Sequence, residues 1–136
     1  MRSFKITIYG GTKPPIEPLD VNKDLQWFCT SLGLVGNRDR NLSTFRIFIT
    51  LLKASRQGKL LSSDNIAYET SLSRATVIHH LTKLSTSGII LEEHERYKLA
   101  VDNLEELVKH VKLEIAQSMA DLEEISKRID EQLGLK

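Results

Sequence analysis

The sequence predicts a mainly α-helical fold with a small β hairpin, a short N-terminal strand and a long C-terminal helix. Three observations support this fold class. Apolar residues recur every three or four positions in several segments bounded by capping residues and glycines; two short apolar runs flank a charged stretch around residue 94; and a seven-residue apolar repeat occupies the C-terminal part. The 136 residues suffice for one small domain with an attached helix.

Composition narrows the class of protein. Apolar residues make up 40% of the chain and charged residues 27%, as in folded soluble domains. No apolar run is long enough to span a membrane, and Lys5 interrupts the N-terminal apolar residues, so we expect neither a membrane helix nor a signal peptide. Cys29 is the only cysteine, which excludes an internal disulfide; we therefore expect a cytoplasmic protein.

Charge is distributed unevenly along the chain. Residues 1–100 carry 14 Lys and Arg against 9 Asp and Glu, a net charge of +5, whereas residues 101–136 carry 5 against 9, a net charge of −4. A basic body favours a polyanionic partner, although many neutral domains divide in the same way.

The N-terminal segment has three kinds of local pattern. Residues 3–9 alternate apolar and polar side chains, which predicts a strand, and all three prolines fall within residues 13–19, which predicts an extended segment. A short helix is expected at residues 23–32, ended by Gly33. Residues 33–41 read as a loop; its two arginines flank an aspartate, and they are suited either to DNA phosphates or to an internal ion pair.

Two helices follow from residue 42. The first carries a broad apolar face typical of a central core helix, can be capped by Asn41 or Ser43, and ends at Gly58. Its expected core residues are Phe45, Phe48, Ile49 and Leu52, with Ile47 and Leu51 widening the face. The second is short, with Ser62 as its cap and Asp64 in its first turn, where the helix dipole favours a negative charge.

The stretch "LSRATVIHHLTKLSTSGII" predicts a third helix. Ser73 is its N-cap, Gly88 supplies the left-handed residue that ends it, and apolar residues recur at four- and three-residue spacing between them. Those buried positions are Val77, Leu81 and Leu84. Short apolar runs at residues 89–91 and 97–99 then enclose a charged centre, which predicts a hairpin.

One long helix is expected after residue 100. Asp102 and Glu105 have the spacing of a capping box, and the helix of about 32 residues would be about 48 Å long. A heptad seam runs along it, interrupted by Ser118 and Gln132, and consists of Leu104, Val108, Val111, Ile115, Leu122, Ile125 and Ile129. The seam can pack on its own domain or on a second copy; the length of the helix favours a homodimer.

The order of helix, short helix, tight turn, capped helix, glycine stop and hairpin is that of a winged helix-turn-helix. The segment "SSDNIAYETSLSRATVIHHLTKLSTSGIILEEHERYKL" resembles the DNA-binding core of ArsR-type and MarR-type transcription regulators over residues 44–99, and the whole chain is similar to small archaeal regulators of this class. The resemblance implies a homodimer that binds specific double-stranded DNA sequences and regulates transcription. Residues 42–100 would form the DNA-binding domain, preceded by residues 1–41 and followed by the dimerisation helix at residues 101–136.

The resemblance also implies roles for individual residues. The helix at residues 73–87 would be the recognition helix in the major groove. Its outward residues that can reach DNA are Ser73, Arg74, Thr76, Ile78, His79 and Lys83. Arg74 and Lys83 suit phosphates, and the other outward residues of the helix suit base edges. Ile78 is apolar where the family often has serine, so it either contacts a thymine methyl group or is partly buried.

Two further features depart from the family pattern. Ser71 stands where the turn usually has glycine, and a left-handed serine costs about 1 kcal/mol, so the turn could have another shape. The wing, usually basic, carries Glu92, Glu93 and Glu95, which phosphates would repel; we therefore expect its tip to stay out of the minor groove.

Other functions have less support in the sequence. It contains no phosphate-binding loop or catalytic constellation, so we expect neither an enzyme nor a cofactor. The four histidines and Cys29 match no zinc spacing, which predicts no metal. The alternative function is a winged-helix protein-interaction module within a larger assembly, such as the transcription machinery, because an acidic wing suits a protein partner.

Overall fold

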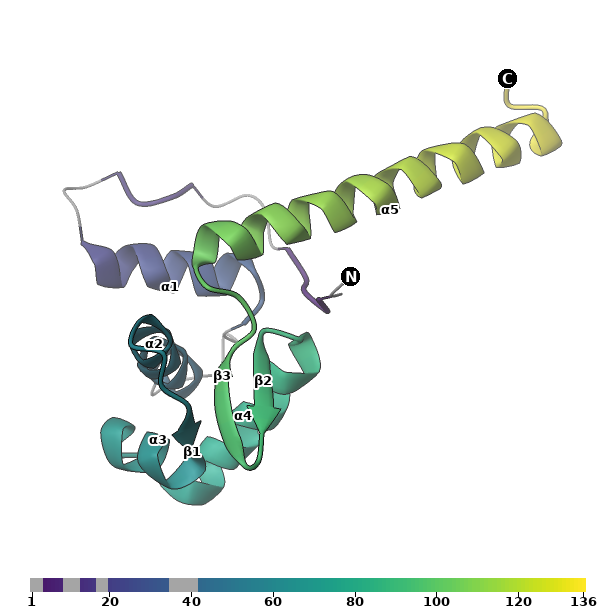
Figure 1. Cartoon of the computed structure of the whole chain (residues 1–136). Coiled ribbons are helices and arrows are strands. Elements are labelled where there is room, and N and C mark those ends of the chain that lie inside the picture. The colour runs from purple at the N-terminus through teal and green to yellow at the C-terminus, as the bar shows by residue number, and fades with distance from the viewer. Residues whose placement is uncertain (1–3, 9–12, 17–19, 35–41) are drawn as a thin grey trace. The chain divides into compact units, whose positions relative to one another are not determined.

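The computed structural model describes residues 4–8, 13–16, 20–34 and 42–136. It divides into two compact units, Met1–Asp102 and Asn103–Lys136. The described part is mainly helical with one small antiparallel sheet (Figure 1), as the sequence predicts. Its elements are α1 (Val21–Ser31), α2 (Ser43–Arg56), β1 (Leu61–Ser62), α3 (Ser63–Thr70), α4 (Arg74–Ser87), β2 (Ile90–Glu93), β3 (Arg96–Leu99) and α5 (Leu104–Leu133).

The predicted N-terminal strand is wrong for the residues that are described. Residues 4–8 belong to no strand. Phe4 is buried, and the Lys5 N–H donates to the carbonyl of Ser87 at 2.9 Å. That carbonyl lies in the last turn of α4, where helical carbonyls lack partners within the helix. The end of a helix offers such isolated acceptors and no ladder, so the alternating pattern does not lead to strand pairing here.

The predictions for the rest of the N-terminal segment can be compared only in part. Residues 13–16 are in neither helix nor strand, as their prolines predict, while residues 17–19 and 35–41 lie outside the described residues. The basic loop with Arg38 and Arg40 therefore lies outside them too. Helix α1 starts two residues earlier than predicted because the carboxylate of Asp20 caps it, accepting the Asn22 N–H at 3.0 Å.

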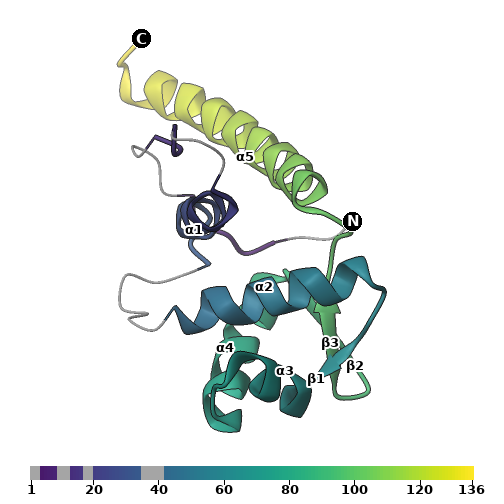
Figure 2. The same cartoon turned by 90° about the vertical axis from the view of Figure 1, so that its left-hand side faces the viewer.

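Helix α2 is the central core helix that the sequence predicts. It lies between α1 and the pair α3 and α4 in both views (Figures 1 and 2). Its deepest residues are Ile47 and Leu51, whereas Ile49 and Leu52 are only half-buried, so the buried face is rotated from the predicted one. The expected cap is also wrong for Ser43, which is the buried first residue of the helix.

Residue Leu42 is the observed N-cap of α2. Its backbone is left-handed, with φ 52°, and no side chain makes a capping hydrogen bond there. The other predicted cap, Asn41, lies outside the described residues. Neighbours on both sides of α2 therefore determine which of its residues are buried and how the chain enters it.

Helices α3 and α4 confirm their local signals. The Ser62 hydroxyl accepts the Asn65 N–H at 3.1 Å, and the Asn65 side chain returns a bond to Ser62, which completes a capping box. Gly88 ends α4 in a left-handed conformation with φ 85°. The three predicted core residues of α4 are at most 2% exposed: Val77, Leu81 and Leu84.

The hairpin of β2 and β3 is confirmed, and its turn is very tight. Glu93 pairs with Arg96, so only His94 and Glu95 form the turn, both with positive φ (50° and 63°). The third strand, β1, was not predicted because two residues carry no recognisable pattern. It pairs with β3 through Leu61 opposite Tyr97, which gives the sheet order β1-β3-β2.

Helix α5 is 30 residues long, close to the prediction, but its cap differs. The Asn103 side chain, rather than that of Asp102, caps it by accepting the Glu106 N–H at 2.8 Å. Within the predicted seam, Val111 is buried and Leu104 is half-buried. Five seam residues are exposed by 40–62%: Val108, Ile115, Leu122, Ile125 and Ile129. No helix among the described residues has the length and apolarity needed to cross a membrane.

Candidate nucleic-acid interface

The turn between α3 and α4 keeps a tight shape without glycine. Ser71 adopts the left-handed conformation, with φ 58° and ψ 29°. The guanidinium of Arg46, on α2, donates to the carbonyl of Thr70, and the Thr70 hydroxyl donates to the carbonyl of Ile66 at 2.7 Å. These bonds attach the end of α3 to α2 and offset the strain at Ser71. The expectation that serine changes the shape of the turn was wrong.

The start of α4 is held by its own side chains. The Ser73 hydroxyl accepts the Thr76 N–H at 3.1 Å and donates to the Thr76 hydroxyl at 2.8 Å. Thr76 is half-buried, and its hydroxyl still has one proton to donate. Ser73 therefore mainly orients the helix, while Thr76 retains one hydrogen bond for an outside partner.

Arg74 lies in the first turn of α4, where it is strongly exposed. Its Nε atom lies 3.5 Å from the Asp64 carboxylate on α3, and both side chains are about 70% exposed. An ion pair in such an exposed position contributes roughly 0–1 kcal/mol in water. A phosphate can therefore compete with Asp64 for this guanidinium.

Three further predicted residues form an outward row on α4. Ile78 is 42% exposed, which settles its alternatives in favour of an accessible side chain. His79 and Lys83 are exposed one turn apart. The structure therefore leaves one apolar, one imidazole and one ammonium group along the same side of a capped helix.

The two adjacent histidines point in different directions, as predicted. His79 faces outward, while the half-buried His80 forms a 2.7 Å hydrogen bond between its Nδ1 and the hydroxyl of Thr44 on α2. The two rings meet edge to face, with centroids 5.2 Å apart. His80 thus fastens α4 to the core, and His79 is free to face a partner.

Sequence reasoning missed two exposed threonines on α4. The hydroxyl of Thr82 donates to the carbonyl of Ile78 at 2.9 Å, and that of Thr86 to the carbonyl of Thr82 at 3.0 Å. Their positions, four residues apart and in step with Ile78, would have identified them. Because their protons are used within the helix, they offer an outside partner methyl groups and hydroxyl acceptors.

The hairpin tip remains acidic in the structure. Glu92, Glu93 and Glu95 are exposed, and only Glu93 has a described ion pair, with Lys98 at 3.5 Å. Burial, followed by the charges of Glu92 and Glu95, raises the pKa of Tyr97 beside them. The tip is therefore electrostatically unsuited to phosphate.

A shallow hollow beside the hairpin was also missed. It lies between α3, β1 and β3, and the cations of Lys59 and Arg96 line it together with Asn65, Glu69 and Tyr68. Tyr68 is 86% exposed, which is unusual for an aromatic residue. The hollow adds two cations to the surface beside α4, and no motif in the sequence indicates that they meet.

Metal ligation has no support in the part of the chain that the structure describes, where no cluster of three His, Cys, Asp or Glu residues is arranged to hold an ion. Comparison of the chain with models of known protein families, with curated proteins and with solved structures found no match in any of the three. The interface is therefore characterised by its own geometry.

Proposed function

We propose that the protein is a winged helix-turn-helix regulator that binds double-stranded DNA through α4 and acts as a homodimer. The observation that carries the proposal is the division of α4 into two faces. Val77, Leu81 and Leu84 are buried, whereas Arg74, Ile78, His79 and Lys83 are exposed. A single exposed helix fits the major groove of B-DNA, which is about 12 Å wide.

The start of α4 supplies further support for DNA binding. The N-terminal N–H groups and the helix dipole favour an anion, and Arg74 adds a positive charge at the same end. Lys83 adds a second charge almost three turns further along. We therefore assign Arg74 and Lys83 to phosphates, and Thr76, Ile78 and His79 to base edges.

The homodimer is supported by α5. Its exposed apolar residues recur over four turns and more, which is unusual for a solvent-facing helix. A second copy of the same stripe would cover them, as in a two-stranded coiled coil. Two linked DNA-binding domains would then read two half-sites.

Two single variants test the role of α4. Lys83→Ala should weaken binding to all duplexes alike and lower the slope of log affinity against log salt by about one, because it removes one phosphate contact. His79→Ala should reduce the preference for the specific duplex over random duplex by roughly 1–3 kcal/mol, because it removes a base contact. Fluorescence anisotropy over a salt series, with a duplex selected from a random pool, measures both quantities.

Lys127→Ala is the matched control, since it removes the same exposed charge from α5. It should change neither the salt slope nor the preference. If the folded double variant of Lys83 and His79 binds duplex DNA as tightly as the parent at every salt concentration, α4 does not contact DNA.

That outcome would favour the second candidate function, a protein-interaction module. Its specific support is the acidic tip of the hairpin together with the 86% exposed side chain of Tyr68. The two functions differ already in the parent protein, because only the DNA-binding protein retains salt-dependent affinity for random duplex DNA.

A further inference from the structure

We propose that α5 pairs with the α5 of a second copy in antiparallel orientation, with Asp121 opposite the partner's Arg128. The inference rests on the homodimer of the proposed function and adds the direction and register of its helices. Two observations support it: the distribution of polar residues within the exposed apolar stripe, and the charges that flank the stripe.

The apolar stripe is widest in the distal half of α5. In heptad notation, position a holds Ile115, Leu122 and Ile129, and position d holds Ser118, Ile125 and Gln132. All six are exposed or largely exposed, and the stripe is widened by Met119 and Leu133, which are 58% and 69% exposed. A partner helix therefore has an open surface from about residue 115 onward.

A parallel pair would place identical residues opposite one another. Ser118 would face Ser118, leaving a small-against-small layer, and Gln132 would face Gln132. On the flanks, Asp121 would lie near the partner's Ser126, and Arg128 near the partner's Leu133. None of these layers or flanks brings opposite charges together.

An antiparallel pair places position a opposite position d. In the proposed register, Leu122 faces the partner's Ile125 at the centre, and the partner's Ile129 fills the space over Ser118. Ile115 faces the partner's Gln132 near the helix end, where the amide can reach water. Large residues thus pack against small ones, which keeps the seam evenly filled.

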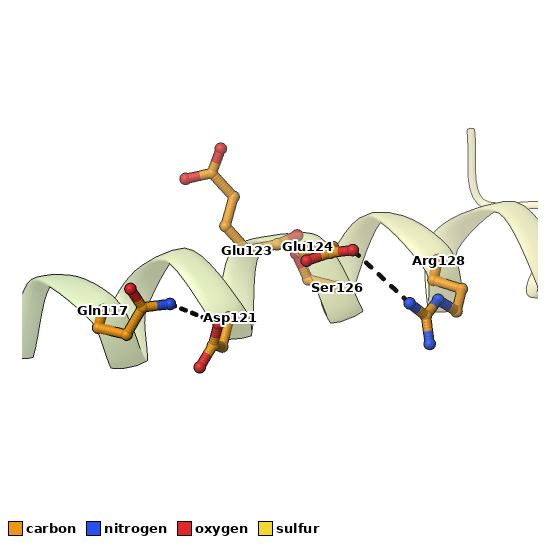
Figure 3. A network of polar contacts seen from close by, with 6 residues as sticks. All are labelled: Gln117, Asp121, Glu123, Glu124, Ser126 and Arg128. Carbon is orange, nitrogen blue, oxygen red and sulfur yellow. Dashed lines mark hydrogen bonds and ion pairs between the residues drawn. The ribbon is translucent and has the colours of Figure 1, made fainter.

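The flanking charges select this register. Asp121 meets the partner's Arg128, and twofold symmetry makes the same ion pair twice. Within one chain these residues make only exposed contacts, Asp121 with Gln117 at 3.0 Å and Arg128 with Glu124 at 3.7 Å (Figure 3). Glu123 points to the other side of the helix in the same view.

Neighbouring antiparallel registers are less favourable. Sliding by one heptad toward greater overlap would put Asp121 opposite itself and would need Val111 in the seam, although Val111 is only 6% exposed. Sliding the other way would put Arg128 opposite itself. Like charges in direct opposition repel, so both registers lose the attraction that the proposed one has.

Distance measurement between two spin labels tests the orientation. Lys109→Cys, on an exposed position of α5, is labelled in a Cys29→Ala background of the full chain. In the proposed register, the two labels are about 29 residues apart along the axis, or about 44 Å at 1.5 Å per residue. A parallel pair would give about 20 Å, and the register with greater overlap about 33 Å.

Glu123→Cys is the matched control label, because it lies near the twofold centre and gives a short distance in the proposed dimer. A distance of about 20 Å from position 109 would overturn the antiparallel pair while leaving the dimer in place. No measurable distance from either label would overturn the dimer itself. DNA binding by the same samples would show whether the DNA-binding part of the proposed function survives.

Charge exchange tests the register independently. Asp121→Arg and Arg128→Asp should each weaken the dimer about tenfold or more, because each turns two attractions into two repulsions, and the double variant should recover the parent's dissociation constant. Glu123→Arg and Lys127→Asp make the same charge changes and break a comparable pair within the helix, but face away from the partner. A double variant weaker than either single variant would overturn the register.

Discussion

Cys29 illustrates how burial changes the chemistry of one residue. Its side chain is fully buried on α1, and burial raises the pKa of the thiol to about 12, against an ordinary value of 9.0. Only the thiolate attacks thiol reagents. Both the fold and the protonation state therefore protect this sulfur.

The first prediction follows from that pKa. At pH 8, the folded protein should react with a thiol reagent only through unfolding, at a rate far below that of the protein in denaturant, as followed by absorbance. Between pH 9 and 12 the unfolded thiol is ionised and the folded one is not, so the unfolded state binds fewer protons. The free energy of unfolding should therefore fall as pH rises through this window.

Cys29→Ala is the control for the pH effect, because it removes the titrating thiol. The variant should show a shallower decline in urea-unfolding free energy above pH 9. The remaining decline has a second source at the hairpin, since the raised pKa of Tyr97 acts in the same direction above its ordinary value of 10.0. Fast labelling of the native parent would contradict the burial of Cys29.

The second residue-scale prediction concerns the strained hairpin tip. Glu95 has φ 63°, in the second position of a two-residue turn where glycine is preferred. Glu95→Gly should stabilise the protein by about 1 kcal/mol, because glycine accepts this conformation without strain. Urea denaturation gives the difference.

A glycine at a neighbouring strand position provides the contrast. Glu92 is exposed within β2 and pairs with Tyr97, so Glu92→Gly should destabilise the hairpin. Equal effects of the two glycines would show that chain flexibility alone, and not the left-handed conformation at Glu95, decides the outcome.

At the scale of the element, α5 depends on a cap that is one residue away from the expected one. Asn103→Ala should destabilise the start of α5 by about 1 kcal/mol, because the Glu106 N–H loses its acceptor. Hydrogen exchange of the first-turn amides reports this locally. Asp102→Ala removes the cap expected from the sequence and should change those amides little; a larger effect at Asp102 would reverse the assignment.

At the scale of the whole molecule, the seam of α5 determines whether two copies associate. Changing Ile115 and Leu122 together to Glu should produce a monomer, because burying four carboxylates in an apolar interface is costly unless the helices separate. Sedimentation equilibrium measures the outcome. Ala116 and Ala120 are exposed beside the seam, and changing both to Glu adds the same charge without entering the proposed interface.

An unchanged dimer in the seam variant would mean that the subunits meet through another surface. A dimer weakened equally by the Ala116 and Ala120 variant would point to general repulsion between acidic helices. Only separation confined to the seam variant supports the apolar stripe as the contact.

Sequence patterns by themselves determined the elements that depend on near neighbours in the chain. The Ser73 cap, the buried stripe of α4, the Gly88 stop, the hairpin and the length of α5 were all predicted correctly. Each rests on residues within a few turns or a single hairpin, so periodicity and capping chemistry contain enough information. The outward residues of α4 follow from the same periodicity, since a helix that buries one face exposes the other.

Tertiary structure decided what depends on residues distant in the chain. Arg46 on α2 holds the carbonyl of Thr70, which lets Ser71 keep a turn without glycine. Strand β1 exists because Leu61 and Ser62 meet β3, and residues 4–8 form no strand because Lys5 meets the end of a helix instead. Hydrogen bonds of this kind join groups that are brought together only by folding, and a local pattern of side chains does not specify which backbone will lie beside it.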